Sequence, residues 1–481
     1  MIRRIATAAL VLLGLAACAT ARAPAPAPPA AAAPDRTRLP ERGPPPELRL
    51  PAQRHFVLAN GLRVRLVEYG RLPIVALELV VDAGGLHDPA DRPGLASLTA
   101  DMMNEGTRTR SATRISDEVG FIGATLSAAA GFDSATLVGA SLTRHLPKLA
   151  ELFADVAMNP SFPEADFRRV QDERLVSLLQ QRDQPHTVAA KAFAEVFWGE
   201  HPYGHWLAGT EGSVKAMRRR DLAEFHARRW TPAGAELVVV GDVKEADLRA
   251  LLEPTLGRWT AGQPGAPPVA APPRGQPRTV AIEKAGAPQA QLQLGMPGVP
   301  RSSPDHVAAE VVFQVLAGGT SSRVFRNIRE AKGYTYGIGG RSDARRLGGS
   351  SVLGGSVKAD RTGEAIRDIL EEVRRLREEP VPPGEMEDAK AALVLGLPAG
   401  FATAGGIAGH LAELVVHGLP DDHWNRYVDQ VQAVTAEDVR RVARQILDPA
   451  RVTLVVVGDA AVVRPQLQGL PIGPVELRPA R

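Results

Sequence analysis

The chain has 481 residues, of which 44% are hydrophobic and 23% are charged, and its formal net charge is +3. This hydrophobic fraction supports ordinary folded cores and excludes wholesale disorder. The balance of 57 basic and 54 acidic residues gives no support to nucleic-acid binding. A single cysteine excludes intrachain disulfides and cysteine-based metal sites, and the one prominent apolar run, residues 5–17, is too short to span a bilayer.

The first 18 residues have the layout of a secretory signal peptide. Two arginines precede an apolar run, which closes on Leu15-Ala16-Ala17-Cys18. This ending resembles the bacterial lipobox, in which the cysteine is acylated and becomes the mature N-terminus. The resemblance implies lipidation of Cys18 and, since Ala19 follows it, a periplasmic protein anchored by lipid to the outer membrane of a Gram-negative bacterium. A plain signal peptide with a chance cysteine is the alternative.

A tether is expected next, because 18 of the 28 residues from Ala19 to Pro46 are alanine or proline. Such a segment has little to bury and tends toward extended polyproline II. It would hold the folded part of the chain away from the membrane. A second stretch rich in proline and glycine, residues 262–277, predicts a linker inside that folded part.

The rest of the chain contains an internal repeat. The segment Val238–Asp242 (VVVGD) recurs as Val455–Asp459, 217 positions later. In each copy a helix and a proline-containing turn precede the apolar run, which is typical of a buried strand followed by a turn. Each half also begins with a strand and then a helix, over residues 77–84 and 94–104 in the first half and residues 292–296 and 305–316 in the second.

The helices of both halves are predicted to be amphipathic. From Thr362 to Glu379, apolar residues recur at helical spacing with charged residues between them. Ser161 and Glu164 form a possible capping box at the start of a helix that continues through Gln181. The chain is therefore predicted to be an α+β protein in which helices pack on sheets twice over.

Several motifs of this chain resemble those of the insulinase-like (pitrilysin) metallopeptidases, which include the mitochondrial processing peptidase. They are Asn60–Val64, Val81–Gly85, Gly94–Ala96, Glu105–Thr107, His201–Gly204, Gly209–Glu211, Ser321–Phe325 and Arg329–Tyr336. The resemblance implies two tandem homologous domains, each a mainly antiparallel sheet covered by helices. The predicted units are a signal peptide (1–18), a tether (19–50), an N-terminal peptidase-like domain (51–262), a linker (263–277), a C-terminal inactive-type domain (278–465) and a tail (466–481).

Active members of that family carry His-x-x-Glu-His on a helix of the first domain. Two histidines one turn apart bind one zinc ion, the glutamate takes a proton from the zinc-bound water, and a distant glutamate completes the metal shell. In this chain the histidine positions are Ser97 and Asp101, the base position is Ala100, and the distant ligand falls at Ser177. We therefore expect no metal and no cofactor bound by this chain, because the set lacks both a zinc shell and a base.

The second half keeps a pair that the resemblance implies is functional. Family members of clamshell form engage the substrate opposite the zinc with an arginine and a tyrosine seven residues later, and Arg329 and Tyr336 have this spacing. The Tyr336 hydroxyl would donate a hydrogen bond to the scissile carbonyl oxygen, and Arg329 would position that tyrosine or the peptide backbone. The alternative is a solvated Arg329 and a packed Tyr336.

Some bacterial members divide these roles between two chains, and this sequence has the pattern of the zinc-free one. We therefore interpret it as a subunit that is inactive alone and gives Arg329 and Tyr336 to a homologous zinc-bearing partner for proteolysis of peptides. Two alternatives stay open: a non-catalytic structural or peptide-binding protein on the same fold, and a self-sufficient peptidase with an unusual site.

Overall fold

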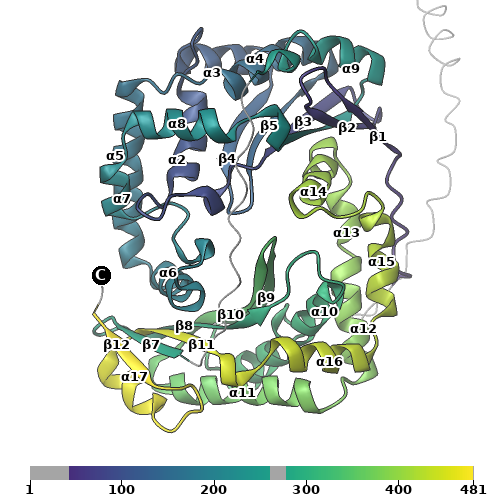
Figure 1. Cartoon of the computed structure of the whole chain (residues 1–481). Coiled ribbons are helices and arrows are strands. Elements are labelled where there is room, and N and C mark those ends of the chain that lie inside the picture. Colours follow the sequence, from purple (N-terminus) through teal and green to yellow (C-terminus); the bar gives the residue numbers. More distant parts are fainter. Residues whose placement is uncertain (1–42, 261–277, 480–481) are drawn as a thin grey trace, which may run out of the picture. The chain divides into compact units, whose positions relative to one another are not determined.

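The computed structural model describes residues 43–260 and 278–479. The predicted signal peptide with Cys18, the tether as far as residue 42 and the whole linker lie outside these residues. From Pro45 onward the described chain forms a single unit that contains two six-stranded sheets, each with its own helices (Figure 1).

The first sheet has the strand order β1-β2-β6-β3-β5-β4. Its strands are β1 (Gln53–Val57), β2 (Arg63–Glu68), β3 (Ile74–Val81), β4 (Thr125–Ala130), β5 (Ala135–Leu142) and β6 (Ala235–Gly241). The helices of this half are α2 (Leu95–Met102), α3 (Ala112–Phe121), α4 (Leu146–Met158), α5 (Glu164–Gln180), α6 (Pro185–Trp198), α7 (Glu211–Ala216), α8 (Arg219–Arg229) and α9 (Glu245–Leu252).

The second sheet has the order β12-β7-β11-β8-β10-β9. Its strands are β7 (Arg278–Glu283), β8 (Gln289–Gly298), β9 (Gly337–Arg345), β10 (Gly348–Lys358), β11 (Thr453–Gly458) and β12 (Val475–Arg478). Its helices are α10 (His306–Ala317), the π-helix η8 (Phe325–Ala331), α11 (Thr362–Glu378), α12 (Pro383–Val394), α13 (Leu397–Gly400), α14 (Ala404–His417), α15 (His423–Ala433), α16 (Ala436–Ile446) and α17 (Ala460–Leu467).

The predicted α+β class with two tandem sheets is confirmed, and the repeat has a structural counterpart. The repeated segments form β6 and β11, which occupy the same place in their sheets and are buried along their whole length. Most strand pairs are antiparallel, but β2 pairs in parallel with β6, and β7 in parallel with β11 and β12. The second sheet reaches past residue 465, because residues 466–479, assigned above to a tail, include β12.

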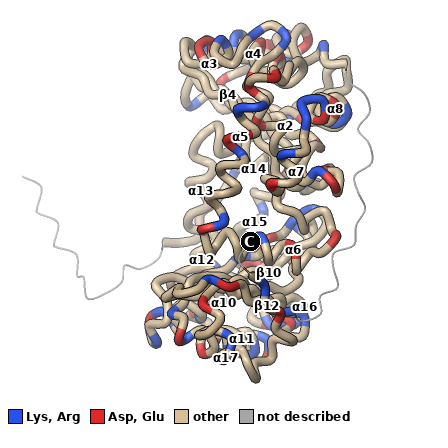
Figure 2. Tube along the Cα trace, turned by 90° about the vertical axis from the view of Figure 1, so that its left-hand side faces the viewer, with Lys and Arg blue, Asp and Glu red and all other residues tan. Residues whose placement is uncertain are grey.

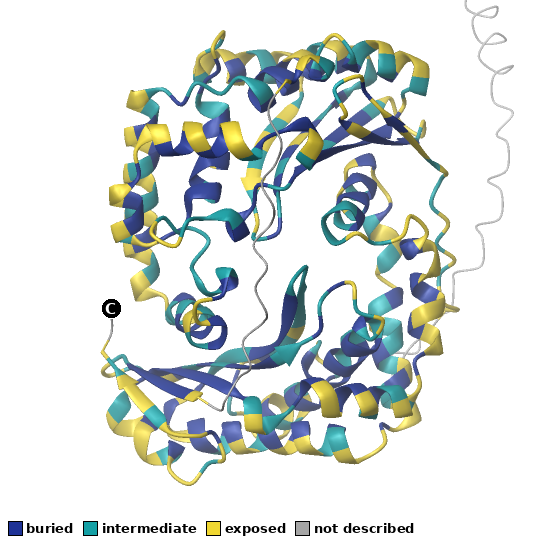
Figure 3. Cartoon of the chain, in the orientation of Figure 1, coloured by how far each residue is buried: buried dark blue, intermediate teal, exposed yellow. Residues whose placement is uncertain are grey.

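The local expectations for individual helices are met in one case and fail in another. Helix α11 alternates buried and exposed residues (Figure 3). Its predicted apolar stripe is buried, and Ile366, Ile369, Val373 and Leu376 have no exposed surface. The predicted capping box at Ser161 is wrong, because α5 begins at Glu164 after Pro163 and has no side-chain cap. The backbone N–H of Ser161 instead donates to the carbonyl oxygen of Gly106 at 2.9 Å, next to the isolated bridge between Thr107 and Pro160.

Each half lends one helix to the sheet of the other. Helix α6 packs against β8 and β11 of the second sheet, and α14 packs against β3 and β6 of the first (Figure 1). Phe193 of α6 lies so close to Gly295 of β8 that a Cβ atom at Gly295 would come within 2.3 Å of its ring. The apolar face of each sheet is therefore completed by residues from the other half of the chain.

The turn between β9 and β10 also joins the two halves. Its Arg345 guanidinium lies over three aromatic rings of the first half, at 4.5 Å from the centroid of Phe132, 4.8 Å from Tyr203 and 5.8 Å from Trp198. Cation–π contacts of this kind are favourable when the cation is desolvated. The Arg345 guanidinium also pairs with Asp343 at 2.8 Å, so the turn contacts the first half through a cation that is already neutralised by its own strand.

Hydrogen bonds reinforce this contact. The side chain of Arg346 donates to Asp82 at 2.9 Å, and its backbone N–H donates to Asp133 at 3.0 Å. The buried hydroxyl of Tyr203 donates to Asp133 and accepts from the backbone N–H of Leu347 at 3.2 Å. Although burial opposes ionisation of Asp82, its contacts with His87 and Arg346 hold its pKa below the ordinary value.

Replacing Tyr203 by phenylalanine is expected to lower the free energy of unfolding by about 1–3 kcal/mol, because the Leu347 N–H and one Asp133 oxygen would be buried without a partner. Urea unfolding followed by circular dichroism measures this change. Tyr69→Phe is the matched control, since the Tyr69 hydroxyl makes only a weak bond of 3.5 Å to the carbonyl oxygen of Ala402. Equal stability of the two variants would contradict the role given to Tyr203.

Charge is mixed over the described surface. Figure 2 shows lysine and arginine interspersed with aspartate and glutamate along the helices of both halves. Within residues 43–260 and 278–479, no single helix has the length and apolar composition needed to cross a membrane. Only the bent pair Pro383–Gly400 and Ala404–His417, which meet at 119°, satisfies those criteria when its helices are taken together.

Candidate functional site

Helix α2 carries three of the four positions of the degenerate zinc site, and its start is held firmly. The Asp88 side chain accepts hydrogen bonds from the backbone N–H groups of Gly94 and Ala96, both at 2.7 Å. Gly94 has a positive φ of 93°, and a Cβ atom there would come within 2.6 Å of the backbone of Gly209. The loop at Gly209 therefore lies directly against the beginning of α2, and only glycine fits at this contact.

An arginine lies at the centre of the degenerate site. Arg174 of α5 donates from one guanidinium nitrogen to the Ser97 hydroxyl at 3.2 Å and to the Asp101 carboxylate. Its other terminal nitrogen donates to the carbonyl oxygen of Ala208 at 3.0 Å. The Arg174 side chain is only 12% exposed. The Arg174 guanidinium thus bonds to both residues that stand where the family motif has its histidines.

The other two positions offer nothing to a metal. Ala100 is buried and has no donor atom. Ser177 is exposed on α5 and accepts a hydrogen bond from the Gln181 side chain at 3.3 Å. The only carboxylate of the set, Asp101, is already paired with Arg174.

Zinc therefore does not fit these residues, since a tetrahedral protein site needs three or four nitrogen, sulfur or carboxylate ligands. A guanidinium beside the single carboxylate also repels a dication. In the part of the chain that the structure describes, no group of three histidine, cysteine, aspartate or glutamate side chains is arranged to hold a metal ion.

The second pair of predicted residues lies at the start of β9. The Arg329 side chain, on the π-helix η8, donates from Nε to the backbone carbonyl oxygen of Tyr336 at 3.0 Å. Its guanidinium also lies 4.7 Å from the ring centroid of Phe325. The Tyr336 residue is 89% exposed. Arg329 thus holds the backbone that presents Tyr336, and the tyrosine side chain extends into solvent.

The structure brings some of the predicted residues together and leaves others apart. Ser97 and Asp101 share Arg174, and Arg329 contacts Tyr336. Among the described residues, no hydrogen bond or ion pair joins the first pair to the second. Arg174 was missed from the sequence, although it lies one helical turn before Ser177 and so faces the same side of α5. A basic residue at that spacing was the available signal.

Comparisons with known proteins agree with this architecture. Residues 66–211 match the family described as Insulinase (Peptidase family M16), and residues 216–393 match the family described as Peptidase M16 inactive domain. The chain belongs to the M16 (insulinase) peptidase family, with an N-terminal M16 domain followed by an inactive-type C-terminal domain.

Its relatives span almost the same length. A protein named as an uncharacterized zinc protease of Mycobacterium bovis is 28% identical over 418 residues, which cover 85% of this chain and 94% of that protein. A crystal structure titled as a peptidase M16 inactive domain from Pseudomonas fluorescens has a TM-score of 0.80 at 25% identity, covering 85% of this chain and 98% of that one. A protease from Helicobacter pylori shares the fold, with a TM-score of 0.80 at 19% identity and coverage of 85% and 100%.

Proposed function

We propose that this chain is the zinc-free subunit of a two-chain M16 peptidase, and that it supplies Arg329 and Tyr336 to a homologous zinc-bearing partner. The observation that carries the proposal is the place of Arg174, whose guanidinium joins Ser97 and Asp101. The Asp101 carboxylate does not need a metal to compensate its charge, because it already has a positively charged partner that is largely shielded from solvent.

The arrangement of Arg329 and Tyr336 supports the second part of the proposal. A hydroxyl that serves another chain or a peptide must be accessible, and Tyr336 is among the most exposed large side chains of the described residues. Its backbone is fixed by the bond from Arg329, so the cost of ordering the tyrosine on binding is reduced. The tyrosine would donate to the peptide carbonyl oxygen as negative charge develops there.

The partner's zinc would supply the activated water, and this chain's residues would bind and orient the peptide. The test is reconstitution. Peptide cleavage is measured for this chain alone, for a zinc-bearing M16 homologue from the same organism alone, and for their mixture. We expect cleavage only by the mixture. Full activity of the homologue alone, with no gain on mixing, would refute the proposal.

We also propose that the chain is exported and held at the outer membrane by a lipid on Cys18. The sequence up to Cys18 supports this, since a basic start, an apolar run and small residues precede the cysteine. The Ala/Pro-rich segment after it would give the folded part reach toward a partner or a peptide in the periplasm.

A further inference from the structure

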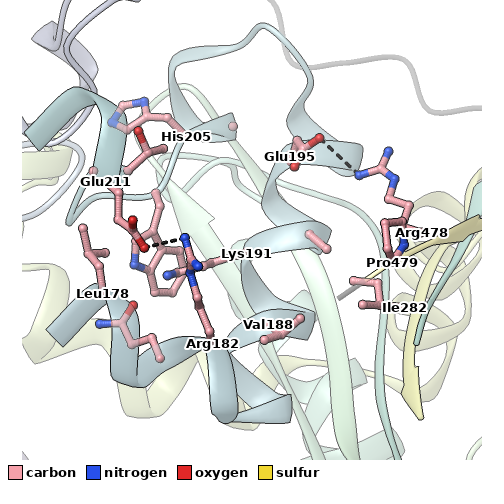
Figure 4. Close-up of a pocket in the computed structure, with 16 residues that line it drawn as sticks. Leu178, Arg182, Val188, Lys191, Glu195, His205, Glu211, Ile282, Arg478 and Pro479 are labelled. Carbon is pink, nitrogen blue, oxygen red and sulfur yellow. Dashed lines mark hydrogen bonds and ion pairs between the residues drawn. The ribbon is translucent and has the colours of Figure 1, made fainter. Parts of the chain in front are cut away.

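A cavity of about 490 Å³ lies beside the degenerate site. It is enclosed by the end of α5, by α6, by the loop that leads into α7, and by β7 and β12 of the second sheet (Figure 4). Two of its wall residues, Leu178 and Gln181, flank Ser177 on α5, and Gly209 follows the Ala208 carbonyl that Arg174 contacts. The cavity and the degenerate site therefore share walls.

The wall of the cavity is largely apolar. Leu178, Val188, Ala192 and Ile282 contribute aliphatic surface, and the Trp206 indole contributes an aromatic face. Ile282 belongs to the second sheet, whereas the other four belong to the first half of the chain. A ligand that fills this space must therefore carry an apolar group.

One positive charge in the cavity has no ionic partner among the residues that the structure describes. Arg182 pairs with Glu211 at 2.5 Å, and Arg478 pairs with Glu195 at 3.1 Å, as Figure 4 shows. Both glutamates of the wall are thus neutralised. Lys191 points into the same space, and no carboxylate of the described residues lies within ion-pair distance of it.

The Lys191 ammonium lies over the Trp206 ring, and its Nζ is 5.2 Å from the ring centroid. Burial, and to a smaller extent the charge of Arg182, lower the pKa of Lys191, while Glu211 acts in the opposite direction. An anion bound beside Lys191 would compensate both unfavourable effects.

Hydrogen-bonding groups are also unused. The indole Nε1 of Trp206 and the Oε1 atom of Gln181 are buried, and neither has a hydrogen-bond partner among the described residues. A buried polar atom without a partner costs free energy. The N–H of Trp206 and the ammonium of Lys191 are donors, so a ligand bound here would meet them with acceptor atoms. Gln181 Oε1, as an acceptor, suits an amide N–H.

We infer that this cavity binds the free C-terminal carboxylate of a peptide whose last residue is apolar. The carboxylate would accept from Lys191 and Trp206, the last side chain would contact the aliphatic wall, and the final peptide N–H would face Gln181. This inference rests on the proposed function for the presence of peptides, but binding here requires neither cleavage nor the partner.

The test is calorimetric titration of the isolated chain with N-acetyl-L-phenylalanine, with its amide, and with a pentapeptide that ends in phenylalanine as either a free acid or an amide. We expect both acids to bind about ten- to hundredfold more tightly than the corresponding amides, as charge-assisted bonds predict. Equal affinities for acid and amide, or no binding of any acid, would overturn the inference. If N-acetyl-L-phenylalanine binds but the pentapeptide acid does not, the assignment of the cavity to peptides is overturned.

Variants identify the residues responsible. Lys191→Gln should lower the affinity for the acids about tenfold or more and leave the affinity for the amides almost unchanged. Trp206→Phe keeps an aromatic wall and removes only the N–H donor. Lys358→Gln is the matched control, since Lys358 is exposed at the end of β10. Unchanged acid binding by Lys191→Gln, with circular dichroism showing an intact fold, would refute the role of this lysine.

The two proposals fail separately. A mixture that cleaves peptides, together with an isolated chain that shows no preference for acids, leaves the proposed function intact and removes the carboxylate site. An isolated chain that prefers acids, together with a mixture that does not cleave peptides, supports the carboxylate site and refutes the proposed function.

Discussion

Replacing Tyr336 by phenylalanine is expected to reduce peptide cleavage by the two-chain mixture about 100- to 1,000-fold, the usual effect of removing one donor to a developing oxyanion. The change removes a single hydroxyl from a side chain that is 89% exposed. Its effect on folding should therefore be small, and the loss should appear in kcat more than in KM.

The matched control is Tyr334→Phe, two residues earlier. Tyr334 is half-buried and packs against the second-half core, so the control removes the same atom from a tyrosine that does not extend into solvent. Steady-state rates are compared at fixed partner concentration, with subunit association measured separately. Unchanged rates with Tyr336→Phe would favour the alternative of a non-catalytic structural or peptide-binding protein.

The second prediction with a large expected effect concerns the affinity of this chain for zinc. The wild-type chain, dialysed against a chelator and then supplied with zinc, is expected to retain no stoichiometric zinc at micromolar concentration. Restoring the three family ligands (S97H, D101H and S177E) together with the base (A100E) should not be sufficient for zinc binding, because Arg174 would put a positive charge beside the dication. Adding Arg174→Ala to these changes is expected to tighten zinc binding about 1,000-fold or more.

The control for this series combines the same four changes with Arg168→Ala. Arg168 lies on the same helix but is exposed and pairs with Glu164 at 3.0 Å. The Arg168→Ala change therefore removes one arginine and leaves the contacts of the site unchanged. Equilibrium dialysis with elemental analysis measures the bound metal, and circular dichroism checks the fold. One tightly bound zinc ion in the wild-type chain would contradict the zinc-free interpretation, and cleavage by that chain alone would then favour a self-sufficient peptidase.

Much of the fold could be predicted because its signals are local and repeated. The β-branched runs at Val238 and Val455 are buried strands wherever they occur, and the stripe of α11 fixes which face is covered. The capping box at Ser161 failed because the backbone N–H of Ser161 bonds to the carbonyl oxygen of Gly106, a residue about 55 positions away in the sequence that local spacing does not indicate. Strand β12 was missed because four residues at an edge carry little pattern.

For the candidate site, the sequence predicts only that the zinc ligands and the base of the family are replaced. The resemblance implies that Ser97 and Asp101 replace the metal-binding histidines and that Ala100 replaces the base, but it does not show what stabilises the Asp101 carboxylate. That answer came from Arg174 on another helix, and it depends on the packing of α2 against α5. The cavity beside it is formed from both halves of the chain, so no single stretch of sequence could indicate it.

The reciprocal placement of α6 and α14 limits how the protein can be divided. A fragment that ends before the linker would leave the valines of β6 without α14, and it would carry the aromatic residues of α6 with no sheet to cover them. Each fragment would then expose a large hydrophobic surface and tend to aggregate. Co-production of both fragments, or of the intact chain, is the practical route to soluble material.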